Sequence, residues 1–211
     1  MYNADSMTGT QCTNYDDITT EGVVWTSVTD IEKTNDKTTQ DLCKGYSNIG
    51  IGTNLKNRLS DISSIPAYFK WSRTNTTEFR GSNLFDFVTS STAGADPNDP
   101  VSSEFMLWIE IWGDQVPIGY SRGPVTAVDL FGISFDVYEG QNPGTGVTVR
   151  SLLPTGSFKG AFQGDLKDWL SAMVGQGYIK DSDFVNVGNA GAEIFYGNSV
   201  MDATVSLKVE V

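Results

Sequence analysis

Apolar and polar residues alternate in short runs along much of the chain. Residues 201–211 alternate without interruption, as in a strand with one face buried and one face in water. Residues 131–137 follow the same pattern, and the glycine-rich residues 139–146 separate them from the β-branched residues 147–149, which indicates a hairpin with a long loop. Turn-forming residues dominate positions 93–100, so we expect a loop there. The pattern predicts a protein made mainly of β-strands.

One segment has the spacing of a helix instead. Asp165 is suited to cap its N-terminus, and Gly175 and Gly177 are suited to end it. The apolar positions between them follow the helical period: Leu166, Trp169, Leu170 and Met173. We therefore expect one helix among many strands.

The strand predicted over residues 104–112 has two unlike faces. One face is plainly core: Phe105, Leu107, Ile109 and Ile111. The other face carries Glu104, Met106, Trp108, Glu110 and Trp112. Tryptophans beside acids suit a sugar, because the C–H faces of sugar rings stack on aromatic rings while the hydroxyls need acceptors. The alternative is that a loop covers the strand, so that the tryptophans fill a second small core and the acids are solvated.

Two single acids stand in other predicted strands. Glu193 is flanked by small and apolar residues, and partial burial there would raise its pKa and suit it to donate a proton. Asp86 lies between Phe85 and Phe87, so it points to the face opposite those rings. For both acids the simpler alternative is a solvated side chain on the outside of a sheet.

The composition limits the chemistry that these acids could serve. The 211 residues, with 22 Gly and 7 Pro, suit a single β-sandwich domain over residues 1–211. The sequence has no histidine, which excludes Ser-His-Asp and Cys-His triads and histidine-based zinc sites. Acid–base chemistry must therefore depend on carboxylates. Cys12 and Cys43 are too few for a disulfide scaffold or a four-cysteine metal site, and their spacing leaves open whether they pair.

Charge and hydropathy exclude two classes of partner. The sequence has 14 Lys and Arg against 26 Asp and Glu, a net charge of -12, so its average surface repels the phosphates of nucleic acids. The longest mostly apolar stretch, residues 105–112, is interrupted by Glu110 and is far shorter than the roughly 18 residues of a membrane helix. We therefore expect neither a nucleic-acid partner nor a membrane partner.

In their order and spacing, five segments resemble glycoside hydrolase family 12, the compact endoglucanases and xyloglucanases of fungi and bacteria. Residues 104–108 resemble the family's Glu-x-Met-x-Trp strand, residues 113–119 the Pro-Ile-Gly turn that follows it, and residues 191–197 the Gly-Thr-Glu-Pro-Phe-x-Gly strand. Residues 62–66 are similar to an Ile-Ser-Ser-Ile-Pro segment of the family, and residues 85–87 to a Tyr-Asp-Leu strand. The likeness covers nearly the whole chain.

The resemblance implies an all-β fold, a jelly-roll β-sandwich of two curved antiparallel sheets with one helix, whose concave sheet forms a groove for a polysaccharide. It implies that Glu104 is the nucleophile, Glu193 the general acid and then the base, and Asp86 a neighbour that hydrogen-bonds the nucleophile. The residues that it places along the groove as substrate-binding are Met106, Trp108, Trp112, Pro117 and Phe195. Such a retaining hydrolase needs two carboxyl groups, no cofactor and no metal.

We accordingly expect a secreted, extracellular monomer whose partner is a β-1,4-glucan: cellulose, mixed-linkage β-glucan or xyloglucan. The chain departs from the family in residues 3–9, where an expected tryptophan is missing, and after Trp25, where further tryptophans are replaced. Each lost stacking platform costs about 1 kcal/mol or more of sugar binding. The alternative function is therefore a non-catalytic glucan-binding β-sandwich module.

Overall fold

The structure is a computed structural model that describes residues 8–211, so residues 3–7 of the segment with the missing tryptophan lie outside the described part. Within it are twelve strands, one α-helix and two short 3-10 helices, Leu59–Asp61 and Tyr120–Arg122. The strands and the helix follow in this order: β1 (Gly9–Thr19), β2 (Gly22–Ile31), β3 (Gly45–Gly50), β4 (Asn57–Arg58), β5 (Pro66–Asn75), β6 (Arg80–Ser90), β7 (Ser103–Trp112), β8 (Thr126–Leu130), β9 (Ile133–Gln141), β10 (Thr148–Pro154), β11 (Ala161–Asp165), α1 (Leu166–Gly175) and β12 (Phe184–Leu207).

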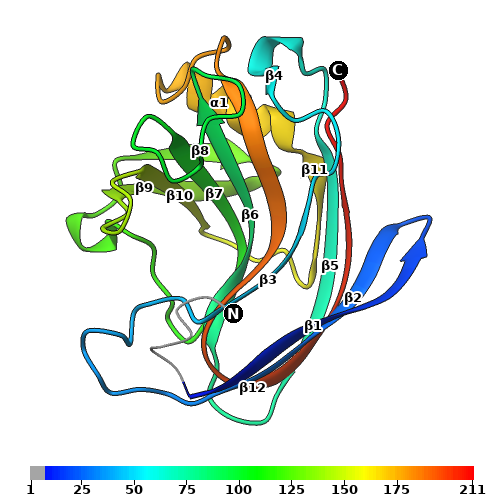
Figure 1. Cartoon of the computed structure of the whole chain (residues 1–211), viewed down its shortest axis with the longest axis vertical. Helices are drawn as coiled ribbons and strands as arrows, with labels where there is room; N and C mark the ends of the chain where they lie inside the picture. Colours follow the sequence, from blue (N-terminus) through cyan, green and yellow to red (C-terminus); the bar gives the residue numbers. More distant parts are fainter. Residues whose placement is uncertain (1–7) are drawn as a thin grey trace.

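Two curved sheets face each other, and β12 belongs to both (Figure 1). Its first half pairs with β3, β4 and β6, and the sheet continues from β6 through β7, β10 and β9 to β8. Its second half pairs with β2 and β5, which carry β1 and β11 at the edges of the other sheet. The expected all-β jelly-roll sandwich with one helix is confirmed.

The core fills the space between the sheets. Phe69 of β5 contacts Phe85 of β6 edge to face, with 6.0 Å between the ring centroids, and both side chains are fully buried. Phe85 also contacts Phe162 of β11 at 5.0 Å. Burial of a large apolar side chain contributes about 1.5–3 kcal/mol to the free energy of folding. Because these rings come from both sheets, their contacts hold the sheets together.

The predicted helix is confirmed, and the cap residue explains where it begins. The Asp165 carboxylate accepts hydrogen bonds from the backbone N–H of Lys167 (2.9 Å) and from that of Ile65 (2.7 Å). One such cap contributes about 1 kcal/mol. The apolar face of α1 packs against the sheet of β6, with the rings of Trp169 and Phe87 5.7 Å apart. Gly177 adopts a φ of +78°, as expected just beyond a helix end.

Three details differ from the sequence-based expectations. The alternating strand expected over residues 201–211 is only the last part of β12, which starts at Phe184 and ends at Leu207. The first half of β12 was not recognised as part of the same strand, because it lacks the simple alternation of a strand with one face in water. Phe131 lies in the β8–β9 turn, where it and Gly132 have φ values of +54° and +77°. The sheets are antiparallel apart from β7 and β10, which pair in parallel. The hairpin of β9 and β10 is confirmed.

The helices within residues 8–211 all lack the length and apolar composition needed to cross a bilayer.

Candidate active site

A single cleft crosses five neighbouring strands of the sheet that contains β7. It has a volume of about 500 Å³ and receives side chains from β3, β12, β6, β7 and β10. Three loop segments complete its walls: residues 41–43, 115–118 and 142–144. The sheet supplies the floor and the loops supply the rim, so the cleft has a rigid base and a shape determined by the loops.

The three predicted acids meet in this cleft. Glu193 comes from β12, Asp86 from β6 and Glu104 from β7, and these three strands are adjacent in the sheet. Asp86 pairs directly with Met106, so Glu104, two residues earlier on β7, is its diagonal neighbour on the same face. All three acids are half-buried. The alternative of solvated acids on the outside of a sheet does not describe them.

Four of the five predicted substrate-binding residues also line the cleft. Met106 and Trp108 lie on the floor next to Glu104, Pro117 lies in the rim, and Phe195 follows Glu193 on β12. Trp108 and Phe195 are almost fully buried, with 1% and 6% of their surface exposed. The floor therefore combines acids with apolar and aromatic surface, as a sugar-binding site requires.

Trp112 does not lie in the cleft. A bulge in the pairing of β6 with β7 sets Leu84 opposite Trp108 but Asn83 opposite Glu110, which leaves one extra residue on β7. Beyond the bulge the alternation of faces is reversed, and the ring of Trp112 packs at 5.9 Å from the ring of Phe79. The guanidinium of Arg73 lies 4.6 Å from the same indole. Glu110 is turned away from the cleft for the same reason, and a hydrogen bond links it to Trp71 of the core.

Burial and mutual repulsion dominate the electrostatics of the three acids. Burial raises the pKa of Glu193 to about 7, and the charge of Asp86 adds to the rise. Burial also raises the pKa of Glu104, and the charges of Asp86 and Glu193 raise it further. The pKa of Asp86 is raised by burial too, whereas a hydrogen bond from Tyr46 lowers it. Near neutral pH the three carboxyl groups are therefore only partly ionised.

Several polar atoms in the cleft are buried and have no hydrogen-bond partner among the described residues. They are Asp86 Oδ1, Trp108 Nε1, Gln115 Oε1 and Ser151 Oγ. An unsatisfied buried polar atom is costly, so its presence in a cleft indicates a place for the hydroxyl groups of a ligand. Gln115, Ser151 and Tyr46 were not predicted from the sequence. Tyr46 and Ser151 lie in segments that carried no signal, because the pairing of β3 and β10 is not visible in the chain, and Gln115 lies in residues 113–119, whose resemblance to the family's turn did not single it out.

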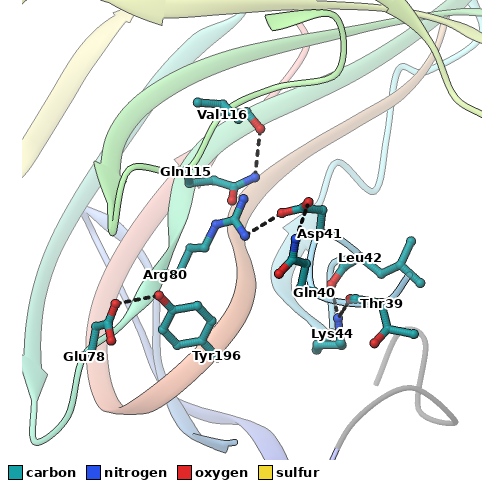
Figure 2. A network of polar contacts seen from close by, with 10 residues as sticks. All are labelled: Thr39, Gln40, Asp41, Leu42, Lys44, Glu78, Arg80, Gln115, Val116 and Tyr196. Carbon is teal, nitrogen blue, oxygen red and sulfur yellow. Dashed lines mark hydrogen bonds and ion pairs between the residues drawn. The ribbon is translucent and has the colours of Figure 1, made fainter. Parts of the chain in front are cut away.

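One end of the cleft is tied to the loop that precedes β3. Arg80 of β6 forms an ion pair with Asp41 of this loop at 2.7 Å (Figure 2), and its guanidinium lies 5.0 Å from the centroid of the Phe195 ring. Lys44 is buried, and its ammonium group donates to the carbonyl oxygens of Thr39 and Leu42. These contacts fix residues 41–43 against the cleft.

Comparisons with known proteins agree with this geometry. The family model described as Glycosyl hydrolase family 12 matches residues 1–210. Xyloglucan-specific endo-beta-1,4-glucanase A of Emericella nidulans is 28% identical over 210 residues, which cover 97% of this chain and 78% of that protein. The protein of the same name from Aspergillus niger is 28% identical over 92% of this chain and 75% of its own length.

Solved structures show the same fold. The catalytic domain of Humicola grisea Cel12A, determined in complex with a soaked thio cellotetraose, aligns with a TM-score of 0.81 and 25% identity over 97% of this chain and 88% of that one. Trichoderma harzianum Endoglucanase 3 aligns with a TM-score of 0.79 and 24% identity over 97% of this chain and 86% of its own.

Proposed function

From the premise that the chain belongs to glycosyl hydrolase family 12 and is a glycoside hydrolase that acts on β-glucans, we propose that it is a retaining endo-β-1,4-glucanase. The substrate is cellulose, mixed-linkage β-glucan or xyloglucan, and xyloglucan is the substrate named for the relatives from Emericella nidulans and Aspergillus niger. The protein works as a secreted, extracellular monomer without a cofactor. The observation that carries the proposal is the meeting of three half-buried carboxyl groups from adjacent strands on one aromatic floor.

The roles that we assign to the two glutamates are those of the family segments that residues 104–108 and 191–197 resemble. Glu104 attacks the anomeric carbon, while Glu193 donates a proton to the leaving glycosidic oxygen. Glu193, now ionised, then takes a proton from the water that releases the sugar from Glu104. Burial raises the pKa of both glutamates, that of Glu193 to about 7 and that of Glu104 to about 8, so either can hold a proton at weakly acidic pH, and the choice of Glu193 as the acid rests on the segment in which it lies. Asp86, the diagonal neighbour of Glu104, interacts with the nucleophile and tunes it.

The remaining cleft residues position the glucan. Trp108 and Phe195 contribute apolar rings of which only a small part is exposed, and Met106 and Pro117 lie beside them. The unpartnered atoms Trp108 Nε1, Gln115 Oε1 and Ser151 Oγ are suited to hydrogen-bond sugar hydroxyls. A neutral polymer rich in hydroxyl groups fits this lining better than a charged one.

The test compares wild type with Glu104→Ala and Glu193→Ala on soluble xyloglucan, mixed-linkage β-glucan and carboxymethylcellulose, with reducing-sugar release as the readout. Both variants should lose nearly all activity. Azide separates the roles: in Glu193→Ala it replaces water at the glycosyl-enzyme and gives a β-glycosyl azide, whereas in Glu104→Ala it attacks the substrate directly and gives the α-anomer. Equal sugar release by all three proteins would refute the catalytic roles.

The same experiment tests the alternative function, a non-catalytic glucan-binding module. If wild type releases no sugar from any glucan but binds cello-oligosaccharides in the cleft, the missing tryptophans have left a binding protein. An α-configured first product, detected by proton NMR, would instead contradict the retaining mechanism.

A further inference from the structure

Tyr46 stands at the centre of the acid cluster, although it belongs to none of the segments that carry the expected chemistry. It lies on β3 directly opposite Glu193 of β12, and its hydroxyl donates a hydrogen bond to Asp86 Oδ2 at 3.3 Å. The bond reaches across β12, because β3 and β6 pair with opposite edges of that strand. Tyr46 therefore pairs with the strand position of Glu193 and bonds the carboxyl group of Asp86, although it belongs to neither of their strands.

We propose that Tyr46 is a positioning residue whose hydroxyl orients the Asp86 carboxyl and favours its ionised form, so that the charge of Asp86 sets the pH range in which the two glutamates work. This inference rests on the proposed function. It goes beyond that function because it assigns the control of the pH range to a residue outside the acid–nucleophile pair.

The geometry gives Asp86 a donor and leaves the two glutamates without one. Tyr46 donates to Oδ2, and Oδ1 of the same carboxyl is buried with no partner among the described residues. Neither Glu104 nor Glu193 receives a side-chain hydrogen bond within the described part of the chain. A hydrogen bond to the charged form favours ionisation, so the Tyr46 hydroxyl opposes the rise in the pKa of Asp86 that burial causes.

The surroundings keep this arrangement stable over the working pH range. Burial raises the pKa of Tyr46 well above its ordinary value, so the phenol remains a donor. The other titratable groups that face it are Glu104 on β7, Glu193 on β12 and Cys43 in the loop before β3. Asp41, at the end of the cleft, is neutralised by its ion pair with Arg80.

The sign of the effect follows from repulsion. An ionised Asp86 raises the pKa of Glu104 and that of Glu193. Without the Tyr46 hydroxyl, Asp86 keeps its proton to higher pH, and both glutamates then ionise in the presence of a neutral neighbour. Tyr46→Phe should therefore move the acidic and the basic limb of the profile of kcat/KM against pH in the same direction, to lower pH, by about 0.5 to 1 pH unit.

Tyr196→Phe is the matched control. Tyr196 lies on β12 three residues after Glu193, and its hydroxyl also donates to a carboxylate, that of Glu78 at 2.8 Å (Figure 2), but Glu78 is exposed and outside the cleft. This variant should leave both limbs in place. In an Asp86→Asn background, Tyr46→Phe should cause no further shift. A lower rate with unmoved limbs in Tyr46→Phe would show a merely structural role and overturn the proposal.

A second measurement separates this inference from the proposed function. Carbon-13 NMR titration of the side-chain carboxyls reports the ionisation of Asp86 in the whole protein without any substrate. Asp86 should titrate at higher pH in Tyr46→Phe than in wild type, and an unchanged titration would overturn the inference even if the enzyme is active. If Asp86 shifts as expected but wild type hydrolyses no glucan, the proposed function fails, whereas the effect of Tyr46 on the ionisation of Asp86 stands.

Discussion

Replacing Glu193 by glutamine should stabilise the folded protein at pH 8 while it removes the proposed acid. Burial raises the pKa of Glu193 from 4.5 to about 7 in the folded state. A raised pKa means that the folded state holds the proton more tightly, so this group's contribution to stability is fully present below about pH 4.5 and is lost as the pH rises to about 7. Since one pH unit corresponds to about 1.4 kcal/mol, the loss amounts to about 3 kcal/mol at pH 8 and to less than about 1 kcal/mol at pH 5.

Urea denaturation at the two pH values measures this difference directly. Glu193→Gln should raise the free energy of unfolding by about 3 kcal/mol at pH 8 and by much less at pH 5, with an unchanged dependence on urea concentration. The control is Glu78→Gln, because the hydrogen bonds from Lys33 and Tyr196 lower the pKa of exposed Glu78, and its loss should stabilise the protein at neither pH. A gain of equal size at both pH values, or no gain at pH 8, would refute the reasoning from burial.

Three further predictions concern the pH profile, the bulge and the loop before β3. In wild type, kcat/KM should fall above about pH 7 as Glu193, whose pKa is raised to about 7, loses its proton; a rate that still rises at pH 8 would contradict its role as the acid. Trp112→Ala should lower the free energy of unfolding by about 2–3 kcal/mol in urea denaturation yet leave the KM for soluble glucan unchanged, whereas Trp108→Ala should raise that KM. Lys44→Met should lower the free energy of unfolding by about 1–3 kcal/mol, because two carbonyl oxygens lose their donor, and it should make residues 36–43 accessible to limited proteolysis.

The alternation of residues along the chain was sufficient to predict a protein made mainly of β-strands, whereas the jelly-roll fold and the floor of the cleft were predicted from the resemblance of segments such as residues 104–108 to those of the family. Residues 104–108 carry the signal most clearly, because a strand repeats every two residues and the faces of Phe105 and Glu104 differ in kind. Asp165 likewise marks the start of the helix, because a cap acts locally. Features that depend on a few neighbouring residues could be predicted in this way.

Features that depend on the pairing partner could not. Trp112 is turned out of the cleft by a bulge. The bulge arises because the consecutive residues Asn83 and Leu84 of β6 pair with residues 110 and 108 of β7, which are two positions apart. Tyr46 and Ser151 enter the cleft because β3 lies beside β12 and β10 lies in parallel beside β7. Long-range pairing of this kind leaves no trace in the local pattern of a single chain.

The continuity of β12 has a mechanical consequence. Its 24 residues run through the centre of one sheet with Glu193 and then through the centre of the other, so a hinge between the two layers would have to break the backbone ladder that carries the acid. The width of the cleft is therefore not changed by motion of one sheet relative to the other. Engineering for bulkier or more slender polymers should be directed at the three rim segments, residues 41–43, 115–118 and 142–144, which can be exchanged while the scaffold beneath them stays in place.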